Sequence, residues 1–559
     1  MCGFILQKKI SKAKILNKKL FKASSKLIFN RGPDNQTYYC NDTYNIFHAR
    51  LKIIDLSSTA NQPFEYMGYN IIYNGEIYNF NELKNNLKVS FSFKTSSDTE
   101  VLLYAYIKWG VKMFSKIEGM YSFIIYNLKK DEIFFSRDIF GQKPLYYFKN
   151  NNEVIFSSEI KPIIKLLSPK KIEFEQREIN KYLNYNFYGD TNLTFFRNIF
   201  QVPPGTYGYI KNKKIILKKI KFKKNKFKIN EKKLIEILKY EIKNHLISDV
   251  DIGIMISDGI DSRSILDFSE KFFKKKLKLF NLEFEDFDNT NFKETYKKKF
   301  CDRLIITKFL KKDFLKTFNN AAKVCEAPPL SLFTLGMMKL FENINKNKIK
   351  VVLNGQGIDE IFGGYDALYN SINNTYIHHP SGQVLSDQKK LFIKKISKKL
   401  EVANNQKSKR FQLAFKTKIP KNLNQYDKIS MHNSVENRSP YLTPKLASLI
   451  YKLKLNQVHN NNHTKYIFRK ILYKITKDKS YFQKKIYQQA PQSEFMLDRN
   501  IFYKITNIIN KKNYCDIFFI KKNILKYLSE FKKKKNNGFL IWQYLSLNFF
   551  INYYKNINF

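Results

Sequence analysis

Two short loops, each directly after an apolar run, carry residues that suit a phosphate group and its metal ion. The first lies in ISDGIDSRSI (256–265), which follows DIGIMI and is rich in serine, glycine and aspartate. Backbone N–H groups at a helix N-terminus bind anions, and serine hydroxyls add further donors. The stretch lacks the GK[ST] of a P-loop. Serine and aspartate are also ordinary helix-capping residues, so this loop alone fits a phosphate site and a plain helix start equally well.

A second loop, in VVLNGQGIDEIFGGY (351–365), favours a phosphate site over a plain helix start. It also follows an apolar run, and its four glycines allow the backbone to approach a ligand closely. Asp359 lies in this loop as Asp261 lies in the first. Carboxylate oxygens are among the ligands that Mg²⁺ takes in proteins. We therefore predict that two neighbouring loops bind a magnesium pyrophosphate, with Asp261 and Asp359 as the metal ligands.

The N-terminal MCG is a third candidate for chemistry. Removal of Met1 would expose Cys2, whose thiol and α-amino group then share one residue. An α-amine with a pKa of about 7.7–8.0 is partly available as a base near neutrality, and N-terminal amines activate adjacent nucleophiles. A cysteine at position 2 is more often incidental when it stands alone, so this prediction depends on the motifs around it.

Composition excludes several classes of protein. The chain has 559 residues, 43% of them hydrophobic, which is enough for more than one packed core. Its five cysteines are far apart and form no CxxC pair, which argues against a disulfide framework or a zinc site and for a reducing compartment. No apolar run approaches the roughly 18 residues of a membrane helix, and the N-terminus has no signal-peptide pattern. We expect a cytoplasmic protein.

The formal net charge of +52 raises nucleic acid and membrane surfaces as partners. The lysines, however, are spread along the whole chain among many asparagines and isoleucines, which favours a compositional bias. The run KKIKFKKNKFK (218–228) is the best local exception. A basic RNA- or membrane-binding protein on a degenerate enzyme scaffold is the alternative from another class, and it predicts strong, salt-dependent binding of nucleic acid.

Two halves of different pattern must position these residues. Up to about residue 200, short apolar runs are separated by turns such as RGPD, NGE and FGQKP, which predicts a β-rich layered structure with a helix near 99–109. From about 230, helical stretches alternate with short buried strands, of which DIGIMIS and IKVVLNG are the clearest. That alternation predicts a parallel α/β sheet with ligands at the carboxyl ends of its strands. QVPPG (201–205) is the expected hinge, giving domains at 1–205 and 206–559.

Several motifs together resemble the glutamine-hydrolysing asparagine synthetase family. The two loops are similar to its SGGxDSS and SGEGADELFGGY segments, SVENRSPYL (434–442) to its EARVPFLD, and HTKYIFRK (463–470) to its KYILR. The N-terminal half resembles a class II glutamine amidotransferase domain through RGPD (31–34), HARLKIIDLSSTANQP (48–63), YNGEIYN (73–79), SSDTE (96–100), SRDIFGQKPLYY (136–147) and SSEIK (157–161). The resemblance covers residues 1 to about 500.

The resemblance implies a mixed α/β and α+β fold. An N-terminal Ntn-type αββα sandwich would be followed by a parallel-sheet PP-loop ATPase domain of the adenine nucleotide α-hydrolase kind. Glutamine hydrolysis would supply ammonia internally to a β-aspartyl adenylate, giving asparagine, glutamate, AMP and diphosphate. ATP and Mg²⁺ are the implied cofactors. The expected partners are small molecules (glutamine, ATP, and aspartate or another carboxylate), with no nucleic acid and no membrane, and a homodimer is compatible with the resemblance.

The resemblance also assigns roles to residues by position. The catalytic set is Cys2, Asn74, Gly75 and Lys465, with Cys2 as nucleophile, Asn74 and Gly75 as the oxyanion hole and Lys465 on the nucleotide's phosphate. Glutamine would be bound by Arg50, Leu51, Lys52, Ile53, Ile54, Asn74, Gly75, Glu76 and Asp98. Within that set, Arg50 would bind the α-carboxylate, and Glu76 and Asp98 the α-ammonium. ATP and its pyrophosphate would be bound by Met255, Ser257, Gly259, Asp261, Ser262, Leu282, Asn354 and Gly355.

The chain departs from the family's pattern in its C-terminal half. Asp258 and Arg263 replace a glycine and a serine of the first loop, and we expect their charges to compensate each other. Gln356 replaces an acid of the second loop and Thr443 an aspartate, while KKIYQQAP (484–491) lacks the family's Gly-Phe. This half would recognise the acceptor. Another carboxylate, such as a sugar acid in surface-polysaccharide synthesis, is therefore the alternative substrate.

Overall fold

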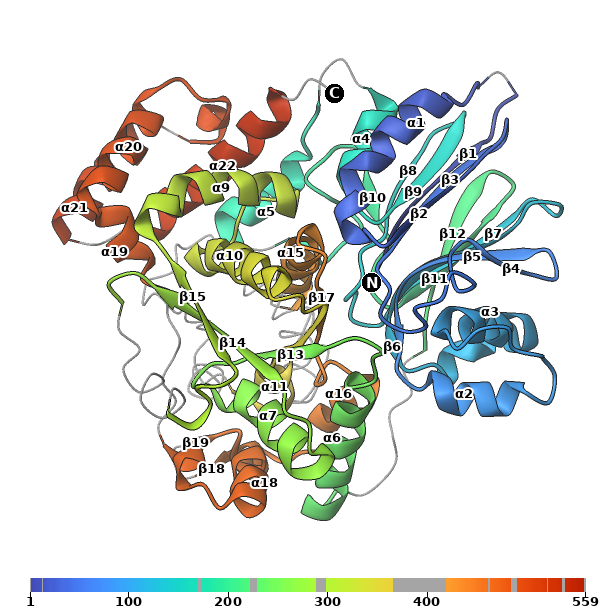
Figure 1. The fold of residues 1–559 in the computed structure, drawn as a ribbon. Helices are drawn as coiled ribbons and strands as arrows, with labels where there is room; N and C mark the ends of the chain where they lie inside the picture. Colours follow the sequence, from blue (N-terminus) through green and yellow to red (C-terminus); the bar gives the residue numbers. More distant parts are fainter. Residues whose placement is uncertain are drawn as a thin grey trace.

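Figure 1 shows the fold as a computed structural model of the chain. It describes residues 2–12, 14–168, 172–186, 188–221, 229–287, 298–364, 419–460, 463–483, 490–519, 521–534 and 538–556. Four features of the sequence fall wholly or partly outside these ranges. They are Met1, residues 222–228 of the lysine run, Tyr365 at the end of the second loop, and residues 484–489 of KKIYQQAP.

Two antiparallel sheets form the centre of the N-terminal half. The first has the order β10-β8-β9-β1-β3-β2 and consists of β1 (Cys2–Lys9), β2 (Asn35–Cys40), β3 (Tyr44–Arg50), β8 (Tyr146–Lys149), β9 (Glu153–Ser157) and β10 (Phe200–Gln201). The second has the order β12-β11-β7-β6-β5-β4 and consists of β4 (Phe64–Tyr66), β5 (Tyr69–Ile77), β6 (Gly119–Asn127), β7 (Glu132–Arg137), β11 (Thr206–Lys211) and β12 (Lys214–Lys219).

Helices cover the outer face of each sheet (Figure 1). They are α1 (Lys18–Ser25) and α4 (Ile160–Leu167) on the first sheet, and α2 (Phe80–Leu87) and α3 (Asp98–Trp109) on the second. Successive side chains of a strand point to opposite faces, and both faces of β1 are buried. Phe4 and Leu6 pack in the core between the sheets, whereas Ile5 packs with Phe21 and Ile160 beneath the helices. These layers confirm the αββα sandwich and the helix expected near 99–109.

Strands β11 and β12 move the boundary between the halves from the expected residue 205. β11 pairs with β7 in antiparallel register, Thr206 opposite Arg137, so residues 206–219 complete the second sheet. QVPPG is a crossing from β10 in one sheet to β11 in the other, rather than a hinge between domains. We therefore take the N-terminal half to extend to Lys219 and the C-terminal half to begin with α6 (Glu231–His245).

A parallel sheet forms the centre of the C-terminal half, as the alternating pattern predicted. Its order is β15-β14-β13-β16-β17. The strands are β13 (Ile252–Met255), β14 (Lys278–Phe284), β15 (Leu304–Phe309), β16 (Val351–Leu353) and β17 (Glu436–Arg438). β13 and β16 are neighbours, with Ile252 opposite Val351. The two glycine-containing loops consequently leave the same edge of the sheet side by side.

Helices pack on both faces of this sheet (Figure 1). The hydrophobic core on one face joins Leu279 of β14 to α6, α7 (Ile260–Phe273) and α18 (Tyr466–Thr476). The core on the other face joins Phe280 of the same strand to α9 (Phe314–Cys325), α10 (Leu332–Lys346) and α15 (Ile419–His432). Other helices are α5 (Gln176–Tyr185), α11 (Ile358–Phe362), α16 (Pro444–Ala447), α17 (Leu455–Val458), α19 (Gln492–Leu497), α20 (Arg499–Asn510), α21 (Lys521–Lys534) and α22 (Gly538–Lys555).

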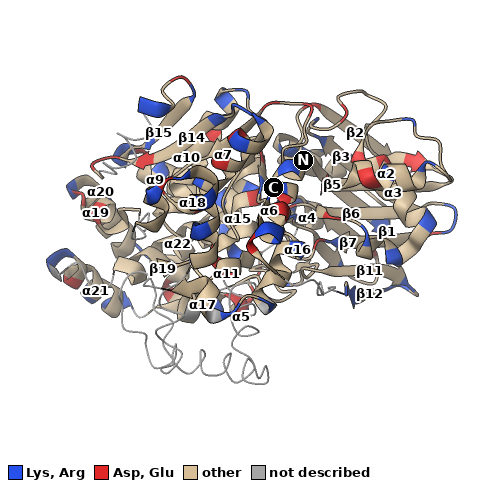
Figure 2. Ribbon diagram, turned by 90° about the horizontal axis from the view of Figure 1, so that it is seen from below, with Lys and Arg blue, Asp and Glu red and all other residues tan. Residues whose placement is uncertain are grey.

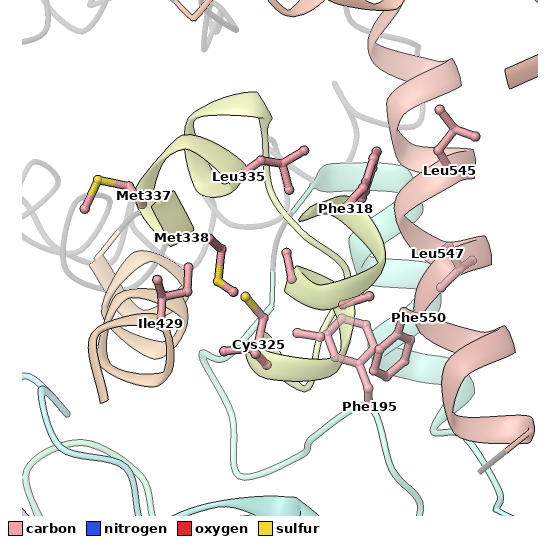
Figure 3. Close-up of a cluster of buried hydrophobic side chains, with 14 of the residues drawn as sticks. Phe195, Phe318, Cys325, Leu335, Met337, Met338, Ile429, Leu545, Leu547 and Phe550 are labelled. Carbon is pink, nitrogen blue, oxygen red and sulfur yellow. The ribbon is translucent and has the colours of Figure 1, made fainter. Parts of the chain in front are cut away.

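Helix α10 has a core side and a cavity side. Figure 3 shows Met338 pointing toward Cys325 and Ile429, inside the cluster that α9, α15 and α22 build. Met337 belongs to the same cluster and also lines the cavity described below. A single helix therefore ties the wall of the cavity to the largest core.

Basic residues occur on elements of both halves (Figure 2), in agreement with the even spread of lysine along the sequence. Within the described ranges, no helix combines the length and the apolarity that crossing a membrane requires.

Two candidate active sites

Strand register brings the residues of the first candidate site together. Cys2 lies opposite Arg50 in the pairing of β1 with β3. The backbone N–H of Cys2 donates to Asn74 Oδ1 at 3.2 Å, which connects the first sheet to β5 of the second. Asn74, Gly75 and Glu76 are consecutive on β5. The predicted nucleophile, oxyanion-hole residues and glutamine ligands thus meet where the two sheets approach each other.

Asn74 and Gly75 suit a developing negative charge. The Nδ2 atom of Asn74 is buried and has no hydrogen-bond partner among the described residues, so this amide keeps a donor available. A Cβ on Gly75 would lie 2.2 Å from the carbonyl oxygen of Met120 and 2.7 Å from Tyr121 Cα on β6. The close approach of β6 therefore requires glycine at this position.

The loop after β3 fixes the Arg50 guanidinium. Nη1 donates to the Ser57 carbonyl at 2.7 Å and to Asn61 Oδ1 at 2.9 Å, and Nη2 donates to the Asp55 carbonyl. The predicted loop residues Leu51, Lys52, Ile53 and Ile54 directly follow Arg50 in the chain. Leu51 and Ile53 are buried in the core of the C-terminal half, so this loop is packed against both halves.

Two buried carboxylates complete the first site. Asp98 begins α3, and its Oδ2 accepts hydrogen bonds from Tyr73 Oη and the Ile77 N–H at 2.9 Å each. Burial raises the pKa of Asp98 to about 6. Burial, together with Glu436 and Asp98, raises the pKa of Glu76 well above its usual value, and Glu76 Oε2 has no hydrogen-bond partner in the described structure. Burial therefore disfavours the charged form of both groups, and a bound ammonium would offset that cost by supplying the missing positive charge.

The Cys2 thiol needs a base. Burial raises its pKa, which disfavours the thiolate. The nearby His48 bonds the Tyr73 carbonyl through Nε2, and burial lowers its pKa to about 3, so this imidazole is neutral and a weak base at physiological pH. The α-amine that Cys2 would carry without Met1 is the better candidate.

The second candidate site is a cavity of about 350 Å³ at the carboxyl ends of β13, β14 and β16. All of the residues predicted to bind the nucleotide line it: Met255, Ser257, Gly259, Asp261, Ser262, Leu282, Asn354 and Gly355. Asp359 and Gln356 line it as well. The structure therefore brings the two loops to one cavity, as their positions after neighbouring strands predicted.

Sequence reasoning missed several residues that line this cavity, among them an apolar group on one helix and a tyrosine on another. Phe333, Met337 and Leu340 of α10 form an apolar wall, and Tyr426 approaches from α15. The three α10 residues recur at the spacing of one helical face, but that spacing is also typical of ordinary core. The spacing therefore indicates a buried helical face but does not distinguish a ligand-binding wall from ordinary core.

The second loop packs closely against the first at Gly355. A Cβ on Gly355 would lie 2.7 Å from Asp261 Cβ and 2.8 Å from the Ser262 nitrogen. Within the first loop, the Ser257 N–H donates to Ser262 Oγ at 3.0 Å and the Gly259 N–H donates to Ser257 Oγ at 3.3 Å. These contacts shape the start of α7, where backbone N–H groups favour an anion.

Lys465 bridges the two predicted metal ligands. Its Nζ lies 2.6 and 2.8 Å from the two carboxylate oxygens of Asp261 and 2.5 Å from Asp359 Oδ1. The lysine side chain is 1% exposed and each carboxylate 23%. Both carboxylates are therefore aimed at one point that favours a cation. This donor set fits Mg²⁺, which proteins usually hold through one or two carboxylates together with substrate phosphates.

Arg263 corrects one expectation. Its ion pair is made with Asp478, at 2.6 Å from Nη2 to Oδ2, and Nη2 also donates to Ser480 Oγ at 2.9 Å. The guanidinium lies over the Tyr481 ring, 4.5 Å from its centroid. Arg263 does lower the pKa of Asp258, but burial outweighs it and raises that pKa to about 6. The arginine thus anchors the first loop to residues 478–481 rather than serving mainly to balance Asp258.

The other departures have different structural roles. Thr443 is the N-cap of α16, where its Oγ1 accepts from the Leu446 N–H at 3.4 Å, a role that threonine and aspartate both fill. Gln356 lies in the cavity itself. Asn354 is tied to β17, since its N–H and Nδ2 both donate to the Arg438 carbonyl. Of Thr443 and Gln356, only Gln356 therefore lies where it would contact a ligand in the cavity.

Buried ion pairs join the halves beside both sites, and sequence reasoning missed them. Arg31 donates to the Cys2 carbonyl at 3.1 Å and to Asp427 of α15 at 2.9 Å. Lys143 lies 3.4 Å from the same aspartate. A small cavity at this junction shares Tyr426 and Asn437 with the nucleotide cavity. Arg31 lies within RGPD, but no pattern links it to a residue 396 positions away.

Comparison with known proteins agrees with this arrangement. Residues 1–221 match the model of a glutamine amidotransferase domain, and residues 233–551 match that of asparagine synthase. Asparagine synthetase (glutamine-hydrolyzing) 1 of Bacillus subtilis is 30% identical over 66% of this chain and 59% of its own length. A putative asparagine synthetase (glutamine-hydrolyzing) 2 of Methanocaldococcus jannaschii is 31% identical over 63% of this chain and 74% of its own. Amidase chry2 of Gibberella zeae is 26% identical over 66% of this chain and 60% of its own.

This chain thus spans less than two thirds of the length of the Bacillus relative. The asparagine synthase model, in contrast, matches more than half of the chain and includes both loops, β17 and the segment that carries Lys465. By that match, this chain belongs to the asparagine synthase family.

Proposed function

We propose that this chain is a glutamine-dependent asparagine synthetase. Glutamine hydrolysis at Cys2 would supply ammonia to a β-aspartyl adenylate made from aspartate and ATP, giving asparagine, glutamate, AMP and diphosphate. The observation that carries the proposal is the presence of two sites in one chain: a cysteine beside a buried amide donor, and a cavity where a lysine joins two carboxylates. Family membership supports it.

In the N-terminal half, each residue type suits its proposed role. The Arg50 guanidinium binds the α-carboxylate of glutamine, and Glu76 and Asp98 bind its α-ammonium. Asn74 Nδ2 and the Gly75 N–H stabilise the oxyanion, at about 3–4 kcal/mol for each donor. The α-amine of Cys2, freed by removal of Met1, takes the proton of the thiol.

In the C-terminal half, the first loop binds the pyrophosphate through Ser257, Gly259 and Ser262. Met255 and Leu282 contact the adenine, and Asn354 and Gly355 the ribose. Asp261 and Asp359 would hold Mg²⁺, which, when bound, neutralises the charge on the phosphates. Lys465 would then exchange carboxylate oxygens for oxygens of the α-phosphate, stabilising the charge that develops there.

Ammonia would pass between the sites inside the protein, because ammonia released into water would be mostly protonated. The junction supports this part of the proposal, since the small cavity beside Lys143 shares Tyr426 and Asn437 with the nucleotide cavity. We place the reaction in the cytoplasm, and the homodimer stays a prediction.

A second candidate is the same chemistry on another acceptor, such as a sugar acid. Gln356 favours it, because this neutral amide lines the cavity where the similar family segment has an acid. The name of the Gibberella relative, an amidase, adds a further reason to test the acceptor. Thr443 no longer does, since capping of α16 accounts for it.

The test uses the full chain with Met1 processing confirmed by mass. Protein, ATP, Mg²⁺, glutamine and aspartate are combined, and asparagine, glutamate and diphosphate are measured. We expect asparagine to form with glutamine, to disappear in Cys2→Ala, and to return in that variant when ammonium is added. Glutamate without asparagine would contradict aspartate as the acceptor and direct the search to other acids.

A further inference from the structure

The glutamine site contains a cation from the other half of the chain. We propose that Arg438 is a positioning residue of that site: its guanidinium, 3.6 Å from Glu76 Oε1, favours the charged form of this carboxylate and leaves it free to bind the α-ammonium of glutamine. The N-terminal half would then be an incomplete glutamine site without β17. This inference rests on the proposed function, since it concerns how Glu76 recognises that substrate.

Arg438 is rigidly held. Its side chain is fully buried on β17. Nε donates to Glu436 Oε1 at 2.5 Å, and Nη1 donates to the carbonyls of His245 and Ile247 at 2.8 and 2.7 Å. These three bonds hold the guanidinium plane, which leaves Nη2 facing the N-terminal half.

The contact between Nη2 and Glu76 has an unusual length. Arg438 Nη2 lies 3.6 Å from Glu76 Oε1, which is an ion pair but longer than a hydrogen bond. Within the described structure, neither Nη2 nor Glu76 Oε2 has a hydrogen-bond partner. The arginine therefore supplies positive charge while the carboxylate keeps lone pairs available. A ligand ammonium needs a Glu76 carboxylate that is both negatively charged and able to accept hydrogen bonds.

The surroundings of Glu76 show why a cation is required. Asp98 at the start of α3 and Glu436 on β17 both raise its pKa, in addition to burial. Arg438 lowers it. The Tyr73 and Tyr78 hydroxyls and the Cys2 thiol also interact with Glu76, and burial raises the pKa of each. Without Arg438, three buried carboxylates would face one another, and protonation of Glu76 would be favoured.

The same residue is fixed to the nucleotide loop. The Arg438 carbonyl accepts hydrogen bonds from the Asn354 N–H at 2.9 Å and from Asn354 Nδ2 at 3.0 Å. The distance between the guanidinium and Glu76 is therefore set by the edge of the sheet that carries the second loop. This contact explains how a residue of the C-terminal half can hold its place in the glutamine site.

The experiment compares Arg438→Gln and Arg438→Lys in the full chain, with glutamate release measured against glutamine concentration and pH. We expect Arg438→Gln to raise the glutamine KM at pH 7 by about tenfold, the factor equivalent to one pKa unit. The increase should shrink as pH rises, because Glu76 then ionises without help. The kcat should change less than KM, and Arg438→Lys should recover most of the affinity.

Lys350→Gln is the matched control. Lys350 pairs with Asp34 across the same junction at 2.8 Å and forms no ion pair with Glu76 in the described part of the chain, so its loss should leave the glutamine KM unchanged. Arg438→Gln with a wild-type KM, or with an increase that is equal at every pH, would overturn the inference. Absence of glutamate release by the wild type would refute the proposed function instead.

Ammonia-supported AMP formation reports whether Arg438→Gln folds. If that activity is lost as well, Glu436→Gln takes over as the test. Removal of this carboxylate removes a group that raises the pKa of Glu76. The pH curve of the glutamine KM should therefore move to lower pH, and an unmoved curve would overturn the inference.

Discussion

The two candidate sites of this chain are positioned in different ways. Residues of the glutamine site lie mainly on strands or directly at strand ends, and pairing with neighbouring strands sets their register: Cys2 opposite Arg50, Gly75 opposite Tyr121. Residues of the nucleotide site lie largely on loops beyond strand ends. There, contacts between side chains, such as Lys465 with Asp261 and Asp359, determine the geometry.

This difference accounts for where the chain departs from its family's pattern. A change on a paired strand alters the backbone of several neighbours, whereas a loop can exchange a side chain and keep its course. Asp258, Arg263 and Gln356 all lie in the two loops or at the start of the helix that follows. We therefore expect substitutions to change the acceptor specificity of the loop-built site more easily than the amide-donor specificity of the strand-built site.

Both sites nevertheless depend on a cation from a distant part of the sequence. Arg438 lies beside Glu76, and Lys465 lies between Asp261 and Asp359. In each case, buried or partly buried carboxylates would repel one another without it. The cations therefore link segments that strand pairing alone does not join.

Loss of Lys465 should have the largest effect and affect only the loop-built site. In Lys465→Met, Asp261 and Asp359 would lose the cation that lies between them, and breaking a buried ion pair costs about 3–5 kcal/mol; their partial exposure favours the lower value. We expect AMP formation to disappear with either glutamine or ammonium as donor, while glutamate release persists. Thermal unfolding should also show a larger rise in Tm with Mg²⁺ than in the wild type, because the ion can replace the ammonium.

Lys470→Met is the matched control, since Lys470 lies on α18, the helix that Lys465 caps, but pairs with Glu231 at the surface, with 53% of its side chain exposed. That variant should retain AMP formation and stability within experimental error. Persistent AMP formation in Lys465→Met would contradict the proposed role of the lysine.

Gly75→Ala should have the next largest effect and affect only the strand-built site. The added Cβ would overlap the Met120 carbonyl, so β5 and β6 must shift and carry the oxyanion donors with them. Loss of one such donor typically lowers kcat by about 10²–10³. We expect glutamate release to fall by that factor, and ammonia-supported AMP formation to remain.

Gly110→Ala provides the comparison for Gly75→Ala. It also has a positive φ of 51°, but a Cβ there would meet no atom within 4 Å. With ψ at −137°, Gly110 lies in a backbone region that side chains rarely adopt, so only strain of about 1–3 kcal/mol is then expected, seen as a lower Tm with normal glutamate release. Equal losses of activity in both variants would mean that strand register does not control the first site.

Sequence reasoning predicted the parts of the fold that local patterns determine. Apolar runs separated by turn residues predicted a β-rich layered half, and the family resemblance implied that it is an αββα sandwich. Apolar runs that end in glycine-rich loops predicted β13, β16 and the shared site. It failed where the structure pairs positions far apart, as for Arg31 with Asp427, because no local pattern records such contacts. The boundary at 205 was misplaced for the same reason, since β11 pairs backward with β7.

Arg263 should give the smallest effect and shows most directly how the loop-built site is held. Its partner Asp478 is 43% exposed, so solvent screens the pair and its coupling should stay below about 1 kcal/mol. We expect Arg263→Ser to raise the ATP KM a few-fold, Asp478→Asn to do the same, and the double variant to add little, because both changes break one contact. Addition of Asp258→Gly to Arg263→Ser should not restore the KM. Restoration would show that Asp258, rather than Asp478, is the partner that matters, and that the first loop is held by charges within it instead of by its contact with residues 478–481.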